Sequence, residues 1–161
     1  MNIYITDLNT ICNKSDLLSK LTDAEITKYR SFKREIRANQ FLVAHALKND
    51  IVKDFPYVSI AHCDNLVVVA ASKYPIGIDI ENTAKQRHFQ PMADLMGFKN
   101  IQSLYDFYRA FTSFESEYKM QPNMVKHKQF YKINDYIICV ASGNDNILPQ
   151  WFGTRIIPEQ I

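Results

Sequence analysis

The sequence predicts an α+β protein, with helices that cover one side of a largely antiparallel sheet. Two β-rich runs, 57–61 and 66–72, flank Cys63-Asp64-Asn65, a pattern typical of a hairpin or a tight strand connection. Residues 101–120 carry aromatic and aliphatic side chains at helical spacing, which predicts a long helix with one buried face. Short strands and longer helices are therefore expected in one chain.

The first third of the chain contains signals for a strand and then for a helix. The isoleucines of Ile3-Tyr4-Ile5 alternate with a polar neighbour, so the chain should open with a short strand. Thr22 and Glu25 have the spacing of a capping box, and a helical stretch should follow them. Its apolar face comprises Ile36, Phe41, Leu42, Ala44, Ala46 and Leu47. The stretch should reach about residue 53, before Pro56 stops it.

The rest of the chain predicts a strand, two helices and a last strand. Pro75 opens a strand from Ile76 to Glu81, and helices are expected at 92–97 and 101–120. The last strand should run from Tyr136 to Ser142, and no internal repeat is evident from the residues. A tail follows that either covers the core or meets a partner. Its apolar residues are Leu148, Trp151, Phe152, Ile156 and Ile157.

Length and composition limit the kinds of protein that the sequence can encode. The 161 residues fit one domain, and 47% hydrophobic with 22% charged residues is the balance of a soluble globular protein. A net charge of +2 gives no global field that would favour nucleic acid or an anionic membrane. Three scattered cysteines without a Cys-x-x-Cys pair suggest neither a disulfide framework nor a zinc site. Because no signal peptide or long apolar run is evident, we expect a cytoplasmic monomer without nucleic-acid or membrane partners.

The strand predicted from Ile76 to Glu81 carries two carboxylates. Alternate side chains of a strand share a face, so Asp79 and Glu81 should project together, with Gly77 leaving the space beside them open. Adjacent carboxylates repel each other and lose hydration, and a bound divalent cation would compensate both effects. Two solvated acids at an exposed strand end explain the same residues equally well.

The helix predicted at 101–120 adds a third carboxylate and a lysine. Its expected buried stripe comprises Leu104, Phe107, Tyr108, Phe111, Phe114 and Tyr118. Glu115 follows Phe111 by four residues and therefore lies at the edge of this stripe, with Lys119 one turn further on. A Glu–Lys pair at this spacing is usually a simple helix salt bridge. The Glu115–Lys119 pair lies beside an aromatic face, however, and this position instead favours a partly enclosed site.

Basic residues and one histidine are further candidates, although each has a simpler explanation. The basic residues that fall within ten positions are Lys28, Arg30, Lys33, Arg34 and Arg37. On its own, such a run is typical of a solvated helix face. His62 follows a predicted strand, and a lone histidine in that position is typically structural.

Four segments of the chain, taken in order, carry a resemblance to a known family. Gly77-Ile78-Asp79-Ile80-Glu81 matches the pattern Gly-(Ile/Val)-Asp-x-Glu, and residues 111–119 resemble Trp-(Ser/Thr)-x-Lys-Glu-(Ala/Ser)-x-x-Lys. Upstream, Ser59-Ile60-Ala61-His62-Cys63 is similar to Ser-x-Ser-His-Ser, and residues 32–47 are similar to a basic helix. These are the motifs of the 4′-phosphopantetheinyl transferases, and together they cover most of residues 30–142.

The order of the motifs implies a class and a fold. Short, trimeric acyl-carrier-protein synthases carry the Asp motif almost at the N-terminus, whereas here it lies mid-chain. The chain therefore resembles the surfactin-synthetase-activating class, whose two similar halves pack as a pseudo-dimer. The resemblance implies one compact domain, 1–161, with a 4′-phosphopantetheinyl transferase-like α+β fold. Its halves would be roughly 1–74 and 75–161, each with helices packed on a mostly antiparallel sheet.

The resemblance also implies a reaction. Asp79, Glu81 and Glu115 would ligate Mg²⁺, the implied cofactor, which would hold the pyrophosphate of coenzyme A. Glu115, or a water that it orients, would take the proton from a serine of an apo-acyl or peptidyl carrier protein. That hydroxyl would attack the β-phosphate and release 3′,5′-ADP. Lys119 would neutralise charge that develops on the phosphates.

Coenzyme A, the other partner, would also contact the first half of the chain. His62 matches the family histidine that contacts a coenzyme A phosphate. The basic residues Lys33, Arg34 and Arg37, with Lys28, would bind the 3′-phosphate or approach an acidic carrier helix, and the sequence does not assign these two roles among them.

The pattern departs from the family at several positions. Phe114 stands where the family has a lysine, Phe111 where it has tryptophan, and Ala61 where it has a serine; His45 occupies a position often held by arginine or aspartate. These changes motivate a first alternative, a degenerate relative that binds coenzyme A or a carrier protein without transfer. An unrelated metal-dependent hydrolase and a purely structural domain are two further alternatives. Since the metal acids and Lys119 are present, we expect an active transferase.

Overall fold

The first half of the chain builds one strand, three helices and a hairpin. The elements are β1 (Asn2–Asp7), a short 3₁₀ helix (Leu8–Thr10), α1 (Lys14–Leu18), α2 (Asp23–Arg30), α3 (Glu35–Ile51), β2 (Tyr57–Cys63) and β3 (Leu66–Ser72). The predicted opening strand and hairpin are both present. The predicted capping box is also present at the start of α2, where Thr22 and Glu25 bond each other's backbone N–H.

The single helical stretch expected up to about residue 53 is interrupted. Residues 31–34 separate α2 from α3, and α3 ends at Ile51, close to the expected end. Arg34 has extended backbone angles, which interrupts the helix. The interruption places Phe32 against Phe41, with ring centroids 5.3 Å apart, so aromatic packing accompanies the break.

The second half contains three strands that the sequence patterns do not predict. One precedes the tail, and two short strands lie within the tail. The elements of this half are β4 (Ile76–Asn82), α4 (Gln90–Leu95), α5 (Leu104–Met120), β5 (His127–Ile133), β6 (Tyr136–Ser142), β7 (Gln150–Phe152) and β8 (Glu159–Gln160). Tyr136–Ser142 is therefore not the last strand. In β5, Gln129, Tyr131 and Ile133 are buried while Lys128 and Lys132 are exposed, so alternation with charged residues hid it.

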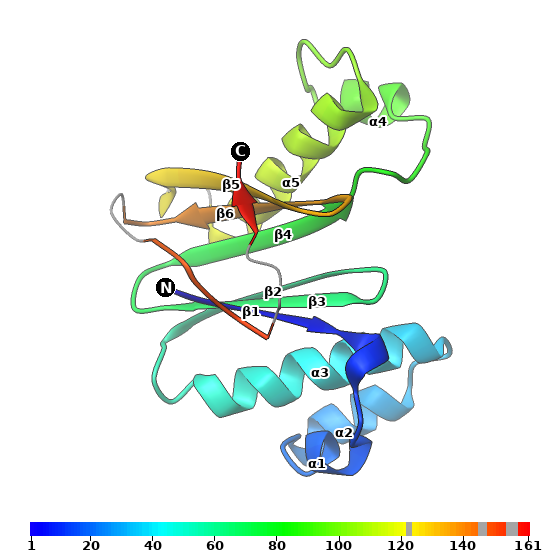
Figure 1. The fold of residues 1–161 in the computed structure, drawn as a ribbon, viewed down its shortest axis with the longest axis vertical. Helices are drawn as coiled ribbons and strands as arrows, with labels where there is room; N and C mark the ends of the chain where they lie inside the picture. The colour runs from blue at the N-terminus through cyan, green and yellow to red at the C-terminus, as the bar shows by residue number, and fades with distance from the viewer. Residues whose placement is uncertain (122–123, 145–147, 154–157) are drawn as a thin grey trace.

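The strands form two stacked sheets with helices on their outer faces (Figure 1). The computed structural model describes residues 1–121, 124–144, 148–153 and 158–161. Sheet A has the order β2-β3-β1-β7 and sheet B the order β4-β6-β5-β8. α3 lies on the outer face of sheet A and α5 on that of sheet B (Figure 1). The α+β class is confirmed, but the molecule has two sheets and both outer faces carry helices, not one sheet covered on one side.

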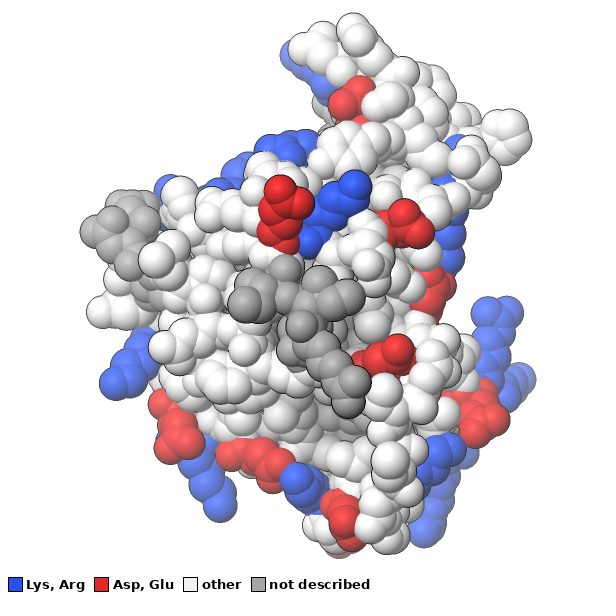
Figure 2. Space-filling model, in the orientation of Figure 1, with Lys and Arg blue, Asp and Glu red and all other residues white. Residues whose placement is uncertain are grey.

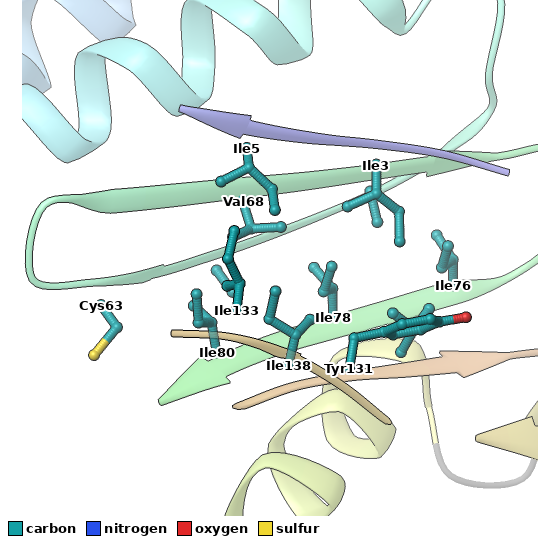
Figure 3. Close-up of a cluster of buried hydrophobic side chains, with 13 residues drawn as sticks. Ile3, Ile5, Cys63, Val68, Ile76, Ile78, Ile80, Tyr131, Ile133 and Ile138 are labelled. Atoms are coloured by element: carbon teal, nitrogen blue, oxygen red, sulfur yellow. The ribbon is translucent and has the colours of Figure 1, made fainter. Parts of the chain in front are cut away.

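The inner faces of the two sheets form the central core. In Figure 3, Ile3 and Ile5 of sheet A point toward Ile78 of sheet B. Because strand side chains alternate, the opposite faces of the same strands contact helices. Val67 and Val69 of β3 pack with α3, and Ile137 of β6 packs with Phe107 and Tyr108 of α5; the structure thus has three apolar layers between its four layers of secondary structure.

The two sheets are built by the same sequence of elements. β1-α3-β2-β3 and β4-α5-β5-β6 give the corresponding orders β2-β3-β1 and β5-β6-β4. Both long helices have 17 residues, and both hairpins pair two seven-residue strands. Each hairpin turn has a residue with left-handed backbone angles, Asp64 at φ 51° and Asn134 at φ 50°. Residues 57–72 and 127–142 thus form an internal structural repeat that the residues alone did not reveal.

The two sheets close differently at their two sides. On one side, the edge strands β2 and β4 lie against each other. On the other side, the tail supplies both edge strands, because β7 pairs in parallel with β1 and β8 pairs with β5. Trp151 of β7 packs on the central core, so this part of the tail covers the core; Ile156 and Ile157 lie outside the described residues.

Candidate active site

The candidate site lies where β2 and β4 meet. The backbone N–H of Ile78 in β4 donates to Oγ of Ser59 in β2 at 3.0 Å, and both residues are buried. This side-chain bond links the edges of the two sheets. His62 lies three residues further along β2, within electrostatic range of Lys119.

Gly77 brings α5 into direct contact with β4. A Cβ atom at position 77 would lie 1.9 Å from the backbone O of Ser116, a distance that no side chain can accept. The space beside Gly77 is therefore filled by α5, and the expectation that it is open is wrong. The close approach positions Glu115 and Lys119, which flank Ser116 on α5, above the acids of β4.

Asp79 is held by Lys119. Lys119 Nζ donates to Asp79 Oδ1 at 2.8 Å and to the backbone O of Ile78 at 3.1 Å. Asp79 is only 8% exposed, and its Oδ2 is buried without a hydrogen-bond partner among the described residues. Burial raises the pKa of the Asp79 carboxyl and Lys119 opposes this, while the nearby charge of Glu115 raises it further.

The other two predicted metal acids are electrostatically close to Asp79. Burial raises the pKa of Glu81, and the charge of Asp79 adds to that effect. Arg87 pairs with Glu81, with its Nη2 3.9 Å from Oε2. Glu115 is half-buried and makes no hydrogen bond or ion pair with any other described residue. The structure therefore brings Asp79, Glu81 and Glu115 into one region, where Lys119 and Arg87 pair with two of the three acids.

His62 and Arg37 join this region from the other half. Arg37 Nη1 lies 2.8 Å from His62 Nε2, and the same guanidinium donates to Gln40 at 2.9 Å. Burial lowers the pKa of His62, and the charges of Arg37 and Lys119 lower it further. His62 therefore contacts Arg37 directly and lies within electrostatic range of Lys119.

Lys33 and Arg34, the other predicted ligand-binding cations, do not contact the acids. Both are exposed and, like Lys28, form no ion pair with a described residue. Arg34 is the residue before the first turn of α3, and its side chain makes no capping bond. These cations are free for an anionic ligand, but the structure does not place them in direct contact with Asp79 or His62.

Sequence patterns missed a polar cluster next to the site. The Asp64 carboxylate in the hairpin turn accepts from Lys85, from Asn82 Nδ2 at 2.8 Å and from the Tyr136 hydroxyl at 3.3 Å. These bonds fix the segment after β4, which also carries Arg87. Asp64 was interpreted only as a turn residue, and no spacing rule connects it with residues 18 to 72 positions away.

The stripe predicted on α5 is only partly buried. Phe107 and Tyr108 are fully buried, whereas Phe114 is 44% and Tyr118 70% exposed. The Phe114 ring meets the Phe98 ring edge-on, with ring centroids 6.0 Å apart, and stacks on the Tyr118 ring, with centroids 6.5 Å apart. The second half of α5 therefore presents an aromatic surface next to Glu115 and Lys119, instead of burying it.

The residues meet the chemical requirements of Mg²⁺, but they do not enclose it. Three carboxylates are the donor type that Mg²⁺ prefers, and the unpartnered Oδ2 of Asp79 calls for a compensating charge. However, no group of three His, Cys, Asp or Glu side chains in the described ranges lies close enough to hold a metal ion. Among the residues that the structure describes, the one cation that contacts Asp79 directly is the ammonium of Lys119.

The chain matches no protein-family model, and no curated protein matches it significantly. Within the described part of the chain, no helix has the length and apolar character needed to cross a membrane. On the face shown in Figure 2, acidic and basic side chains are interspersed, in keeping with the small net charge.

Proposed function

We propose that the protein is a 4′-phosphopantetheinyl transferase, which transfers phosphopantetheine from coenzyme A to a serine of an apo-acyl or peptidyl carrier protein. The main support is the meeting of Asp79, Glu115 and Lys119 beside the β2–β4 contact. These residues come from two separate motifs of that family, and a side chain of a third motif, His62, reaches the same region. The repeated arrangement of elements is consistent with the pseudo-dimeric class.

The residues suit phosphoryl transfer, in which positioning and charge neutralisation matter most. Asp79, Glu81 and Glu115 would hold Mg²⁺, which would supply positive charge to the pyrophosphate of coenzyme A. Glu115, which has no partner among the described residues, is free to accept the proton of the carrier serine. The serine oxygen then bonds to the β-phosphorus while the bond from that phosphorus to the bridging oxygen breaks, and 3′,5′-ADP leaves.

The cations supply the other half of the site. The Arg37 guanidinium lies against the His62 ring. This pair therefore offers N–H donors to a phosphate at the end of β2. Lys33 and Arg34 extend the positive charge along the start of α3 and are free to meet the 3′-phosphate or an acidic carrier. Asp79 is buried, whereas Lys33, Arg34 and Arg37 are exposed, so we assign metal binding to the acids and phosphate binding to these cations.

The direct test is an intact-mass assay of several apo-carrier proteins incubated with the protein, coenzyme A and Mg²⁺. We expect one carrier to gain the mass of phosphopantetheine, and we expect chelation of the metal or Glu115→Gln to abolish the gain. Glu117→Gln is the matched control, because Glu117 lies two residues further on α5 and pairs with Lys128 outside the site. Transfer that persists in Glu115→Gln would contradict the assignment of the acids.

A second candidate function is binding without transfer. The observation that favours it is the exposed aromatic surface of Phe114, which replaces a family cation beside the site. This candidate predicts that coenzyme A binds while no carrier in the panel gains mass. Phe114→Lys then separates the two cases, since restored transfer would identify Phe114 as the cause of lost activity.

A further inference from the structure

A cavity of about 340 Å³ lies between α1 and α3, on the outer face of sheet A (Figure 1). Val43, Leu47 and Asp50 line it from α3, and their spacing of four and three residues places them on one face of that helix. Thr6 lines it from β1, on the strand face opposite to Ile5, which belongs to the central core. The cavity shares no residue with the candidate active site at the β2–β4 contact.

The wall of this cavity changes from apolar and buried to charged and exposed. Val43 is 4% exposed and Leu47 is half-buried, and both pack with the apolar layer between sheet A and α3. Asp16, Lys20 and Asp50 are exposed. The apolar side chains therefore form the interior and the charged ones surround the opening. An apolar lining with a few placed polar groups is typical of pockets for small molecules.

The opening attracts a positive charge. Among the described residues that line the cavity, two are acids and one is a lysine. Lys20 Nζ donates to Asp50 Oδ2, and Asn13 Nδ2 donates to Asp16 Oδ2 at 2.7 Å. An ionised carboxylate has about four acceptor positions, so Asp16 and Asp50 can each accept further hydrogen bonds. Because Lys20 is already held by one of these acids, an ammonium is attracted to the opening and a carboxylate is repelled.

We propose that this cavity binds a small amphiphilic amine, with its apolar chain against Val43 and Leu47 and its ammonium between Asp16 and Asp50. Its volume corresponds to about ten groups of the size of a water molecule, at roughly 30 Å³ each, so a chain of about eight carbons with one amine fits. The binding site is independent of the proposed transferase reaction, because the two regions have no side chain in common.

Calorimetry at pH 7 with three probes of equal chain length, octylamine, octanol and octanoate, tests the class of ligand. Octylamine is protonated at this pH and should bind on the order of tenfold more tightly than octanoate, with octanol in between. No binding of octylamine, or octanoate binding as tightly, would overturn the proposal. Octanol binding as tightly as octylamine would overturn the assignment of the charged group.

The place of binding is tested by filling the cavity. Leu47→Trp puts an indole into the space that the chain occupies and should abolish binding of octylamine. Val52→Trp is the matched control, because Val52 is 46% exposed at the end of α3 and does not line the cavity. Equal affinity of the two variants for octylamine would place the ligand elsewhere and overturn the proposal.

A surface variant tests the charge contact without a change in the core. Asp16→Asn should weaken binding of octylamine about threefold, the size expected for one exposed ion pair, and should leave octanol binding unchanged. Asp54→Asn, at an exposed acid outside the cavity, is the control and should bind both probes as the wild type does. Unchanged affinity of Asp16→Asn for octylamine would overturn the role of this carboxylate.

Discussion

Gly77 lies directly beneath the backbone of Ser116, so closely that a Cβ atom would be 1.9 Å from the Ser116 carbonyl oxygen. The contact is between main chains, and no side-chain rotation can relieve it. It fixes the distance between α5 and β4 and, through it, the approach of Lys119 to Asp79. Packing in the second half and the geometry of the candidate site therefore depend on the same glycine.

Gly77→Ala should lower the free energy of unfolding by about 3 kcal/mol, the upper part of the usual cost of overpacking, because backbone must move. The control is Gly143→Ala, whose Cβ would be no closer than 3.3 Å to its nearest neighbour, a Pro75 side-chain atom. Chemical denaturation of both variants measures the difference. Equal stability of the two variants would show that α5 does not press on β4.

Ser59→Ala should weaken the contact between the two sheets. The Ile78 N–H would lose its buried acceptor, and an unsatisfied buried donor costs about 1–3 kcal/mol. Amide hydrogen exchange should accelerate at Ile78, while the amide of Ile138 in the interior strand β6 should keep its protection. If the Ile78 amide exchanges at the wild-type rate in this variant, the bond from Ile78 to Ser59 contributes nothing to the contact between the two sheets.

Trp151→Ala should destabilise the protein more than Phe152→Ala. Trp151 packs on the central core and meets the Tyr131 ring at 5.0 Å, whereas Phe152 is 40% exposed and stacks on Tyr4. We expect losses of about 2–3 kcal/mol for Trp151→Ala and about 1 kcal/mol for Phe152→Ala, since the larger, partly buried Trp151 packs on the central core. Thermal unfolding of both variants shows which of them loses more stability. A larger loss for Phe152→Ala would mean that the tail does not close the core.

Glu25→Gln should destabilise the protein at neutral pH and progressively less on acidification. The Glu25 carboxylate accepts bonds from the Thr22 N–H, His45, Lys48 and Asn49, which join α2 to α3. Although burial alone would raise the pKa of Glu25, these bonds lower it overall. A carboxyl whose pKa is lower in the folded state stabilises the fold above its unfolded pKa, about 4.3, and loses that contribution as pH falls toward the folded value.

The measurement for this prediction is urea denaturation of the wild type and Glu25→Gln between pH 7 and pH 3. The free energy of unfolding of Glu25→Gln should be about 1–2 kcal/mol below that of the wild type at neutral pH, because the variant loses the helix cap and the charged hydrogen bonds. This difference should narrow below about pH 4.3. A difference in the free energy of unfolding that widens on acidification would contradict a stabilising role for the hydrogen bonds to the Glu25 carboxylate. The same contacts give His45, which departs from the family pattern, a structural partner.

Local patterns predicted the elements that depend on neighbouring residues. The capping box of Thr22 and Glu25 and the hairpin around Asp64 arise from short-range spacing, and both are confirmed. The long helix expected at about 101–120 is present as Leu104–Met120. The strand β5 was missed because lysines alternate with its buried residues. The short strands β7 and β8 were missed because they exist through pairing with distant strands.

Features that depend on tertiary contact could not be read from spacing. The filled space at Gly77, the attachment of Lys119 to Asp79 and the cluster around Asp64 all join residues at least 18 positions apart. The acids themselves were found because alternation on a strand fixes a shared face for Asp79 and Glu81. The sequence thus predicted members of the candidate site, while the sheets and α5 determine which of them touch.

The most direct measurement is calorimetric titration with coenzyme A in the presence of Mg²⁺ or chelator, because it needs no cognate carrier. The proposed site predicts binding with Mg²⁺, a large loss of affinity with chelator, and the same loss in Asp79→Asn with metal present. Asp94→Asn, a change at an exposed acid on α4, should bind as the wild type does. Binding that is indifferent to Mg²⁺ and to Asp79, or no binding at all, would contradict a metal-dependent coenzyme A site at the junction of β2 and β4.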